Sequence, residues 1–166
     1  MKTIYYDVHK QSDEDLHHHV LVMFKDLNLL RRFDIDEKKL DNFVSEITKQ
    51  YIPDAPYHNK LHAFDVCHFS YVLITLCEAS EYLSKMDELC LLISALAHDA
   101  GHDGFNNEFH NKLGSDRAIT YAFNSAQENY SNSILVRTLR KEGCDILCSM
   151  NVEDQERATT KMVKMI

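Results

Sequence analysis

The chain has 166 residues, of which 45% are hydrophobic and 27% charged, and its formal net charge is −8 with histidines neutral. This size and composition indicate one globular domain over residues 1–166 rather than a disordered segment, and the acidic balance argues against nucleic acid as a partner. We expect a cytoplasmic protein with reduced thiols and no membrane span, because signal-peptide, CxxC and long apolar segments are all absent from the sequence.

The first half of the chain predicts two helices before a proline-containing segment. Ser12 is a suitable N-cap for a helix over 13–29, and residues 29–33 are expected to connect it to the next helix. Asp36 caps a second helix, which ends before Pro53. Its apolar side chains are spaced as one buried stripe: Leu40, Phe43, Val44, Ile47 and Tyr51.

Two long apolar helices are predicted next. The first spans about 58–82, and its expected inward side chains are Val66, Phe69, Leu73, Leu76 and Cys77. The second begins after Ser84, and its expected inward side chains are Met86, Leu89, Leu92, Ile93, Leu96 and Ala97. Gly101 and Gly104 mark its end, since glycine permits a left-handed or tight backbone there.

The remainder predicts further helices over 115–121, 126–140 and 154–165, the last capped from Asn151 or Asp154. No segment alternates apolar and polar residues, so the predicted fold is all-α. The last helix reaches Ile166 without a stop signal, and we expect the domain to be truncated at its C-terminus.

Other histidines are assigned to packing or to solvated surface. His17, His18 and His19 are consecutive, so they point in different directions around the first helix and do not predict a metal site. His68 is expected to be packed, and His110 to lie in a polar loop.

Two histidine motifs carry the chemistry. The first, at 57–66, places His58 and His62 four residues apart on a predicted helix face, with Asp65 one turn later to hold an imidazole in its metal-binding tautomer. The second, at 97–107, contains His98, Asp99 and His102 at the end of a buried helix. Imidazole and carboxylate ligands suit zinc, iron or manganese, and carboxylate with water suits magnesium. The pair of motifs therefore predicts a metal-assisted hydrolase.

At these residues the sequence resembles the catalytic domain of class I cyclic nucleotide phosphodiesterases, within the HD-domain phosphohydrolases. The resemblance rests on Tyr57-His58-Asn59 with His62, Asp65 and Val66, on His98-Asp99 with His102, Gly104 and Asn107, and more weakly on Ser125 to Asn129. It runs from about Asp36 to the end and covers roughly the first half of a family catalytic domain.

The resemblance implies a role for each matched residue. His62, His98 and Asp99 would bind a metal, usually zinc, and Asp99 would bridge to a second metal, usually magnesium (or manganese). His58 would be the general acid, Tyr57 would line the substrate pocket, and His102 and Glu128 would hydrogen-bond water at the metals. The implied reaction is hydrolysis of the 3′,5′-cyclic phosphate of cAMP or cGMP to the 5′-monophosphate.

Two departures from the family pattern qualify this function. Tyr130 and Ser131 stand where the family carries histidines, and a further aspartate ligand, a purine-binding glutamine and a stacking phenylalanine have no place in the 166 residues. We therefore predict little or no activity from this chain alone, and association through exposed apolar surface, as in a homo-oligomer. The alternatives are another HD-type phosphohydrolase, such as a nucleotidase, or a truncated non-catalytic interaction protein.

Overall fold

The computed structural model describes residues 2–166, and within that range it contains helices but no β-strand. The elements in chain order are η1 (Val8–Lys10), α1 (Asp13–Asp26), α2 (Leu29–Phe33), α3 (Glu37–Thr48), α4 (Lys60–Leu76), η2 (Ala79–Glu81), α5 (Lys85–Ala97), α6 (Asn107–Leu113), α7 (Asp116–Thr120), α8 (Ala126–Leu139) and α9 (Val152–Met165). The prediction of an all-α fold is confirmed. No helix in the described part is long and apolar enough to cross a membrane.

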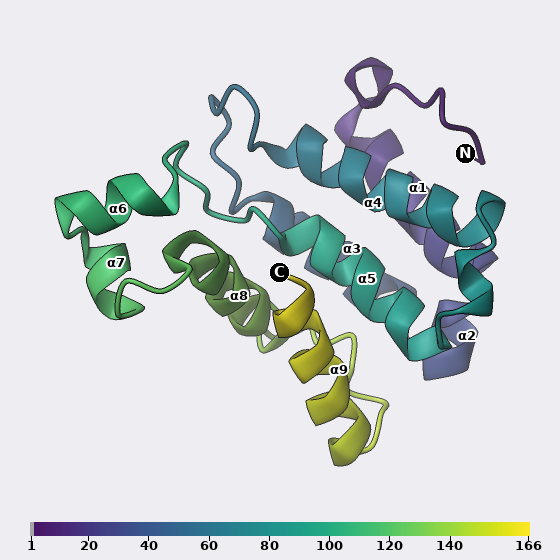
Figure 1. Ribbon diagram of the computed structural model, residues 1–166. Helices are drawn as coiled ribbons and strands as arrows, with labels where there is room; N and C mark the ends of the chain where they lie inside the picture. The colour runs from purple at the N-terminus through teal and green to yellow at the C-terminus, as the bar shows by residue number, and fades with distance from the viewer. Residues whose placement is uncertain (1) are drawn as a thin grey trace.

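Helix α5 lies at the centre of the molecule, with α4 on one side and α9 on the other (Figure 1). Its predicted inward side chains are all buried, and Leu89, Leu92, Ile93 and Leu96 have no exposed surface. On the α9 side, the Ser94 hydroxyl donates a hydrogen bond of 3.3 Å to a backbone carbonyl of α9. Helix α5 is thus the core element whose far end carries the second histidine motif.

Polar caps fix where the main helices begin. Ser12 and Ser84 each form a reciprocal capping box with the aspartate three residues later. The Asp36 side chain accepts from Lys39 N, and that of Asn151 accepts from the third residue of α9. The starts after Ser12, Asp36 and Ser84 are confirmed as predicted, because capping is decided by residues close in sequence. Helix α9 begins at Val152, earlier than the predicted start at 154, and its cap is Asn151, one of the two residues predicted.

The region around residues 26–34 differs from the prediction. Helix α1 ends at Asp26, and residues 29–33 form the short helix α2 instead of a connection. Asn28 and Asp34 bracket α2 with φ values of 58° and 52°. Asn and Asp tolerate this left-handed conformation better than other non-glycine residues, so the chain turns twice here without glycine or proline.

The inward face predicted for α4 was wrong in part, as were its ends. Phe69, Leu73 and Leu76 are 54%, 38% and 50% exposed, and Cys77 is also exposed. The helix instead buries Ala63, Phe64, Cys67, His68, Tyr71, Val72 and Ile74. Since α4 has apolar residues on every side, their spacing does not reveal which side faces the core.

The exposed side chains of α4 give the predicted association a specific location. Phe69, Leu73 and Leu76 succeed one another at helical spacing and form an apolar surface strip. We expect the chain to sediment as more than a monomer at micromolar concentration, and the double substitution Phe69→Ser, Leu73→Ser to lower the measured mass. A monomeric wild-type chain in sedimentation velocity would contradict this prediction.

The segment around His110 was also predicted wrongly. His110 belongs to helix α6, capped by Asn106, and is only 4% exposed, whereas a polar loop was expected. Its ring contacts the Ser115 hydroxyl at 2.9 Å and an Asp103 carboxylate oxygen at 3.1 Å. Hydrogen bonds to polar side chains allow this histidine to be buried, and helical periodicity does not predict such partners.

An ion pair between α5 and α9 predicts a specific acid sensitivity. The Lys161 ammonium, and then the Ser84 hydroxyl, lower the pKa of Asp87 to about 2. A lowered folded-state pKa contributes stability above the unfolded pKa of about 3.9, and that contribution is lost as the pH falls toward 2. We expect Asp87→Asn to reduce the free energy of unfolding by about 1 kcal/mol at pH 7 and by much less near pH 2.

Urea denaturation at several pH values measures this difference. Asp54→Asn is the control, because Asp54 is exposed in a connecting segment. A deficit in Asp87→Asn that is the same at pH 7 and pH 2.5 would show that the ion pair is not its cause.

Candidate metal centre

Side chains from α4 and from the end of α5 converge at one point. The Nε2 atom of His98 lies 3.2 Å from Nε2 of His62 and 3.0 Å from Oδ2 of Asp99. The same Asp99 oxygen lies 3.5 Å from Nε2 of His62. Each residue thus offers one ligand atom to a cluster whose atoms all lie within 4.8 Å of one another.

The local sequence explains how the cluster is positioned. Asn59 caps α4 by accepting from the backbone amides of Leu61 and His62, which fixes His62 in the first turn. His98 is the C-cap of α5, where the buried apolar helix ends. Residues 36 positions apart are brought together because α4 packs along α5.

The donor set fits a divalent metal ion. The Nδ1 atom of His98 lies 2.8 Å from the backbone oxygen of Ala95. A carbonyl oxygen can only accept, so Nδ1 carries the proton and Nε2 presents its lone pair to the cluster. Ligands at about 2.0–2.1 Å from a tetrahedral ion would be about 3.3 Å apart, close to the three separations here.

Electrostatics in the cluster favour the ligating forms of His62 and Asp99. Burial, and then the neighbouring His98, lower the pKa of His62, so its ring is neutral near pH 7. Burial alone would raise the pKa of Asp99, but its hydrogen bond and attraction to His98 outweigh this and lower it. Burial alone would lower the pKa of His98, and the contact with Asp99 raises it instead. Metal binding needs the Nε2 atom of His98 to be free of a proton, so the raised pKa of this ring would weaken binding as the pH falls.

His58 lies beside the cluster but not on α4, which begins only at Lys60. The predicted sharing of one helix face by His58 and His62 was therefore wrong, and their ring centroids are 6.2 Å apart. The ring of His58 instead stacks on that of His102 at 3.8 Å. Burial, and then His58, lower the pKa of His102. The ring of Tyr57, which is 61% exposed, lies 4.5 Å from that of His62.

Glu128 and Asp65 have different relations to the cluster. Glu128 lines a cavity of about 360 Å³ together with His98 and Asp99, and its carboxylate accepts hydrogen bonds of 2.9 and 3.2 Å from Asn107. Asp65 is exposed, and within residues 2–166 no hydrogen bond joins it to His62. Its charge acts only as a minor influence that raises the pKa of His62.

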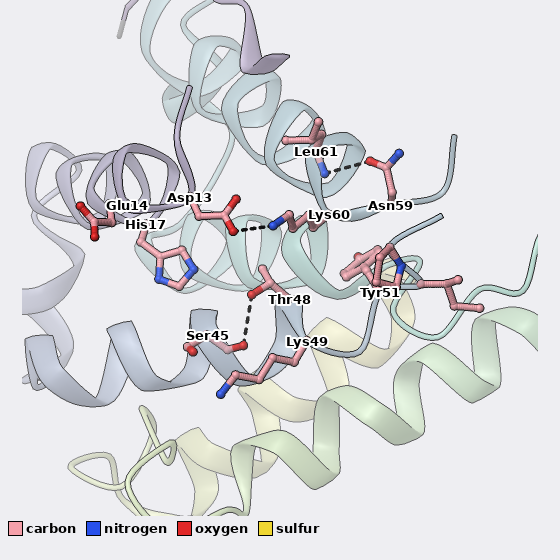
Figure 2. Close-up of a pocket in the computed structure, with 12 residues that line it drawn as sticks. Asp13, Glu14, His17, Ser45, Thr48, Lys49, Tyr51, Asn59, Lys60 and Leu61 are labelled. Atoms are coloured by element: carbon pink, nitrogen blue, oxygen red, sulfur yellow. Dashed lines mark hydrogen bonds and ion pairs between the residues drawn. The ribbon is translucent and has the colours of Figure 1, made fainter. Parts of the chain in front are cut away.

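A second cavity, of about 600 Å³, lies between the ends of α1, α3 and α4 and is not lined by His62, His98 or Asp99. Figure 2 shows Lys60 reaching Asp13 from α4 to α1, and Tyr51 in the wall of this cavity. The Tyr51 hydroxyl donates a hydrogen bond of 3.0 Å to Leu96 O and accepts a longer one, of 3.4 Å, from Asp99 N. Tyr51 thus connects the wall of this cavity to the backbone of Asp99 in the cluster.

The sequence alone did not identify Tyr51 as a support for the cluster. It was predicted only as a core residue, because it continues the apolar stripe of α3. Beside it, the backbone oxygen of Gln50 accepts from Gly101 N at 3.0 Å. These contacts span about 50 residues, and no local sequence pattern signals them.

Comparison with known proteins identifies the family. A family model described as 3′5′-cyclic nucleotide phosphodiesterase matches residues 57–166, which include all of the cluster. The chain belongs to this family. Its all-helical fold agrees with a solved phosphodiesterase domain, that of the RhoPDE fusion protein from the choanoflagellate Salpingoeca rosetta, with a TM-score of 0.92 and 32% identity.

Two curated phosphodiesterases are similar to this chain over segments of different length. The 3′,5′-cyclic-nucleotide phosphodiesterase regA of Dictyostelium discoideum is 33% identical over 161 residues, which are 97% of this chain and 20% of that protein. The cGMP-specific 3′,5′-cyclic phosphodiesterase alpha of Plasmodium falciparum (isolate 3D7) is 41% identical over 113 residues, 68% of this chain and 12% of that protein. The chain thus spans about a fifth or less of these two relatives, and 50% of the solved Salpingoeca domain.

Proposed function

We propose that this phosphodiesterase chain carries the metal-binding and proton-donating part of a site that hydrolyses the 3′,5′-cyclic phosphate of cAMP or cGMP to the 5′-monophosphate. The observation that carries the proposal is the convergence of His62, His98 and Asp99 on one point. The similarity to curated enzymes named for cyclic AMP, for cyclic GMP or for both supports the substrate class.

His62, His98 and Asp99 are the residues that would hold the first metal, which we propose to be zinc. Asp99 and Glu128 line the same cavity. We propose that Asp99 also binds a second ion there, magnesium or manganese. When bound, such ions supply positive charge for the phosphoryl oxygens and lower the pKa of water to about 7. The protein's part is to keep the imidazole lone pairs and the carboxylate directed at one place.

His58 is the proposed general acid for the leaving 3′ oxygen. It lies beside His62 and is held face to face with His102, so its ring has a defined orientation. The lowered pKa of His102 keeps that neighbouring ring neutral near pH 7. Glu128 and His102 are proposed to hydrogen-bond water near the ions, and Tyr57 to contact the substrate.

We also propose that residues 1–166 act as one domain that corresponds to the N-terminal part of a phosphodiesterase catalytic domain. A single buried cluster that includes Val8 near one end and Met162 near the other supports this proposal. The cyclic nucleotide is the proposed partner, and the cytoplasmic location stays a prediction.

Hydrolysis of two kinds of phosphodiester tests the function. We expect the chain, supplied with zinc and magnesium, to hydrolyse bis(4-nitrophenyl) phosphate, whose activated leaving group needs neither a purine-binding pocket nor a general acid. Turnover of cAMP and cGMP by the same 166 residues should be little or none, because the purine-binding residues implied by the resemblance have no counterpart in them. Release of nitrophenolate and of 5′-monophosphate are the two measurements.

Matched variants separate the outcomes. His98→Ala should abolish hydrolysis of the activated diester, whereas His58→Ala should leave it nearly unchanged and remove any residual 5′-monophosphate formation. Loss of both reactions in both variants would argue against the assigned proton donor. Hydrolysis of a nucleoside monophosphate instead of a cyclic diester would favour a nucleotidase, and no hydrolysis at all would favour a non-catalytic interaction protein.

A further inference from the structure

The loop that follows α5 is held from two sides. On the α3 side, Gln50 O accepts from Gly101 N, as described above. On the other side, two side chains bind consecutive carbonyl oxygens of the loop: the Ser131 hydroxyl donates 3.0 Å to Ala100 O, and the Arg117 guanidinium donates 3.1 Å to Gly101 O. The loop between Asp99 and His102 is therefore fixed at its backbone by residues that are not ligands.

Arg117 is itself held in a defined place. Its guanidinium lies over the ring of Tyr130 at 3.9 Å from the centroid, and its side chain is only 15% exposed. Tyr130 in turn packs directly on Gly101, because a Cβ atom at residue 101 would lie 2.6 Å from the tyrosine ring. Arg117, Tyr130 and Gly101 thus form a stack in which the arginine is oriented by an aromatic face.

The far end of the same loop joins the arrangement through Asp103. Gln127 Nε2 donates 2.8 Å to Asp103 Oδ1, and the Gln127 side-chain oxygen accepts from Arg117. The other Asp103 oxygen lies 3.7 Å from Arg117, and His110 contacts Asp103 at 3.1 Å. Gln127 and His110 are buried, so this polar network has little competition from water.

We propose that Arg117 is a positioning residue for the metal centre. It fixes the backbone between Asp99 and His102, and so directs the Asp99 carboxylate at the imidazoles of α4 and α5 without touching the ion. It also connects the centre to α6 and α7, which lie at one edge of the molecule (Figure 1). The inference rests on the proposed metal site and adds a residue that neither histidine motif contains.

Cobalt binding and amide hydrogen exchange together test the proposal. In Arg117→Met, which keeps a long side chain without the charge or the donors, we expect Co²⁺ affinity to fall about tenfold and the visible absorption of bound Co²⁺ to change. In the metal-free chain, loss of the guanidinium should also raise the hydrogen-exchange rates of the Gly101 and His102 amides about tenfold. Arg117→Lys, which keeps one donor, should recover part of both, and Arg137→Met on the exposed face of α8 should change neither.

The outcomes distinguish this inference from the proposed function. If Arg117→Met keeps wild-type Co²⁺ affinity and spectrum, Arg117 does not position the ligands, whatever its effect on exchange. If wild-type protein binds no Co²⁺, the proposed metal site is wrong. Independently of that result, unchanged amide exchange in Arg117→Met would show that Arg117 does not fix the backbone of the loop. Should Arg117→Met fail to fold by circular dichroism, Arg117→Lys is compared with wild type by the same criteria.

Discussion

Zinc affinity is expected to fall about 10²–10³-fold when His98 is replaced by alanine. Structural zinc sites with four ligands bind with about 10–16 kcal/mol at pH 7, which is about 2.5–4 kcal/mol for each ligand. His98 is central to the cluster, because its Nε2 lies within 3.2 Å of both His62 Nε2 and Asp99 Oδ2. Competition against a chromophoric chelator measures the dissociation constant.

The control for this experiment is another histidine. His18→Ala removes an exposed imidazole on α1 and should leave zinc affinity unchanged. Asp99→Asn keeps the shape of the third proposed ligand but removes its charge, so the zinc affinity of this variant should also fall. Wild-type zinc affinity in His98→Ala would show that the converging side chains do not form the metal site.

Alanine at Gly101 is expected to reduce the free energy of unfolding by about 2–4 kcal/mol. The residue has φ +76°, a conformation that costs an L-residue about 1 kcal/mol. The added Cβ would also lie 2.6 Å from both Ile134 Cδ1 and Tyr130 Cε1. Overpacking of a well-filled site costs about 1–3 kcal/mol, so the two terms together give the range. Urea denaturation monitored by circular dichroism measures it.

Gly104 supplies the matched control. Its φ is +89°, but a Cβ there would meet no atom within 4 Å. Gly104→Ala should therefore show the backbone cost alone, about 1 kcal/mol. Equal destabilisation by the two substitutions would mean that α8 does not pack against the loop as described.

Local chemistry decided which parts of the fold were predictable from the sequence. Caps such as Ser12 and Ser84, and the buried stripe of α5, depend on residues within a few turns of one another, and they were predicted correctly. The face of α4 that Phe69 occupies was predicted wrongly, because an apolar helix does not encode its own orientation. Helix α2 was missed since left-handed Asn28 and Asp34 are weak signals compared with glycine.

In the candidate site, too, the residues within local motifs were predicted and those that depend on tertiary packing were not. Residue type and spacing indicated the two motifs, the family resemblance implied His62, His98 and Asp99 as the ligands within them, and the structure brings all three together. Their assigned roles remain proposals. Tyr51 and Arg117, which hold the loop behind them, lie outside both motifs. Their contacts depend on how α3 and α7 approach α5, which is a tertiary property without a sequence signature.

The position of the three proposed ligands has a consequence for folding. His62 belongs to the first turn of α4 and the other two to the end of α5, so a bound ion would cross-link helices whose ligands are 36 residues apart. The unfolded chain has no such preformed chelate, so the ion would shift the folding equilibrium toward the native state by mass action. Each tenfold excess of metal over its dissociation constant would add about 1.4 kcal/mol. Metal supply would then govern how long the protein survives heat or proteolysis as well as whether it reacts.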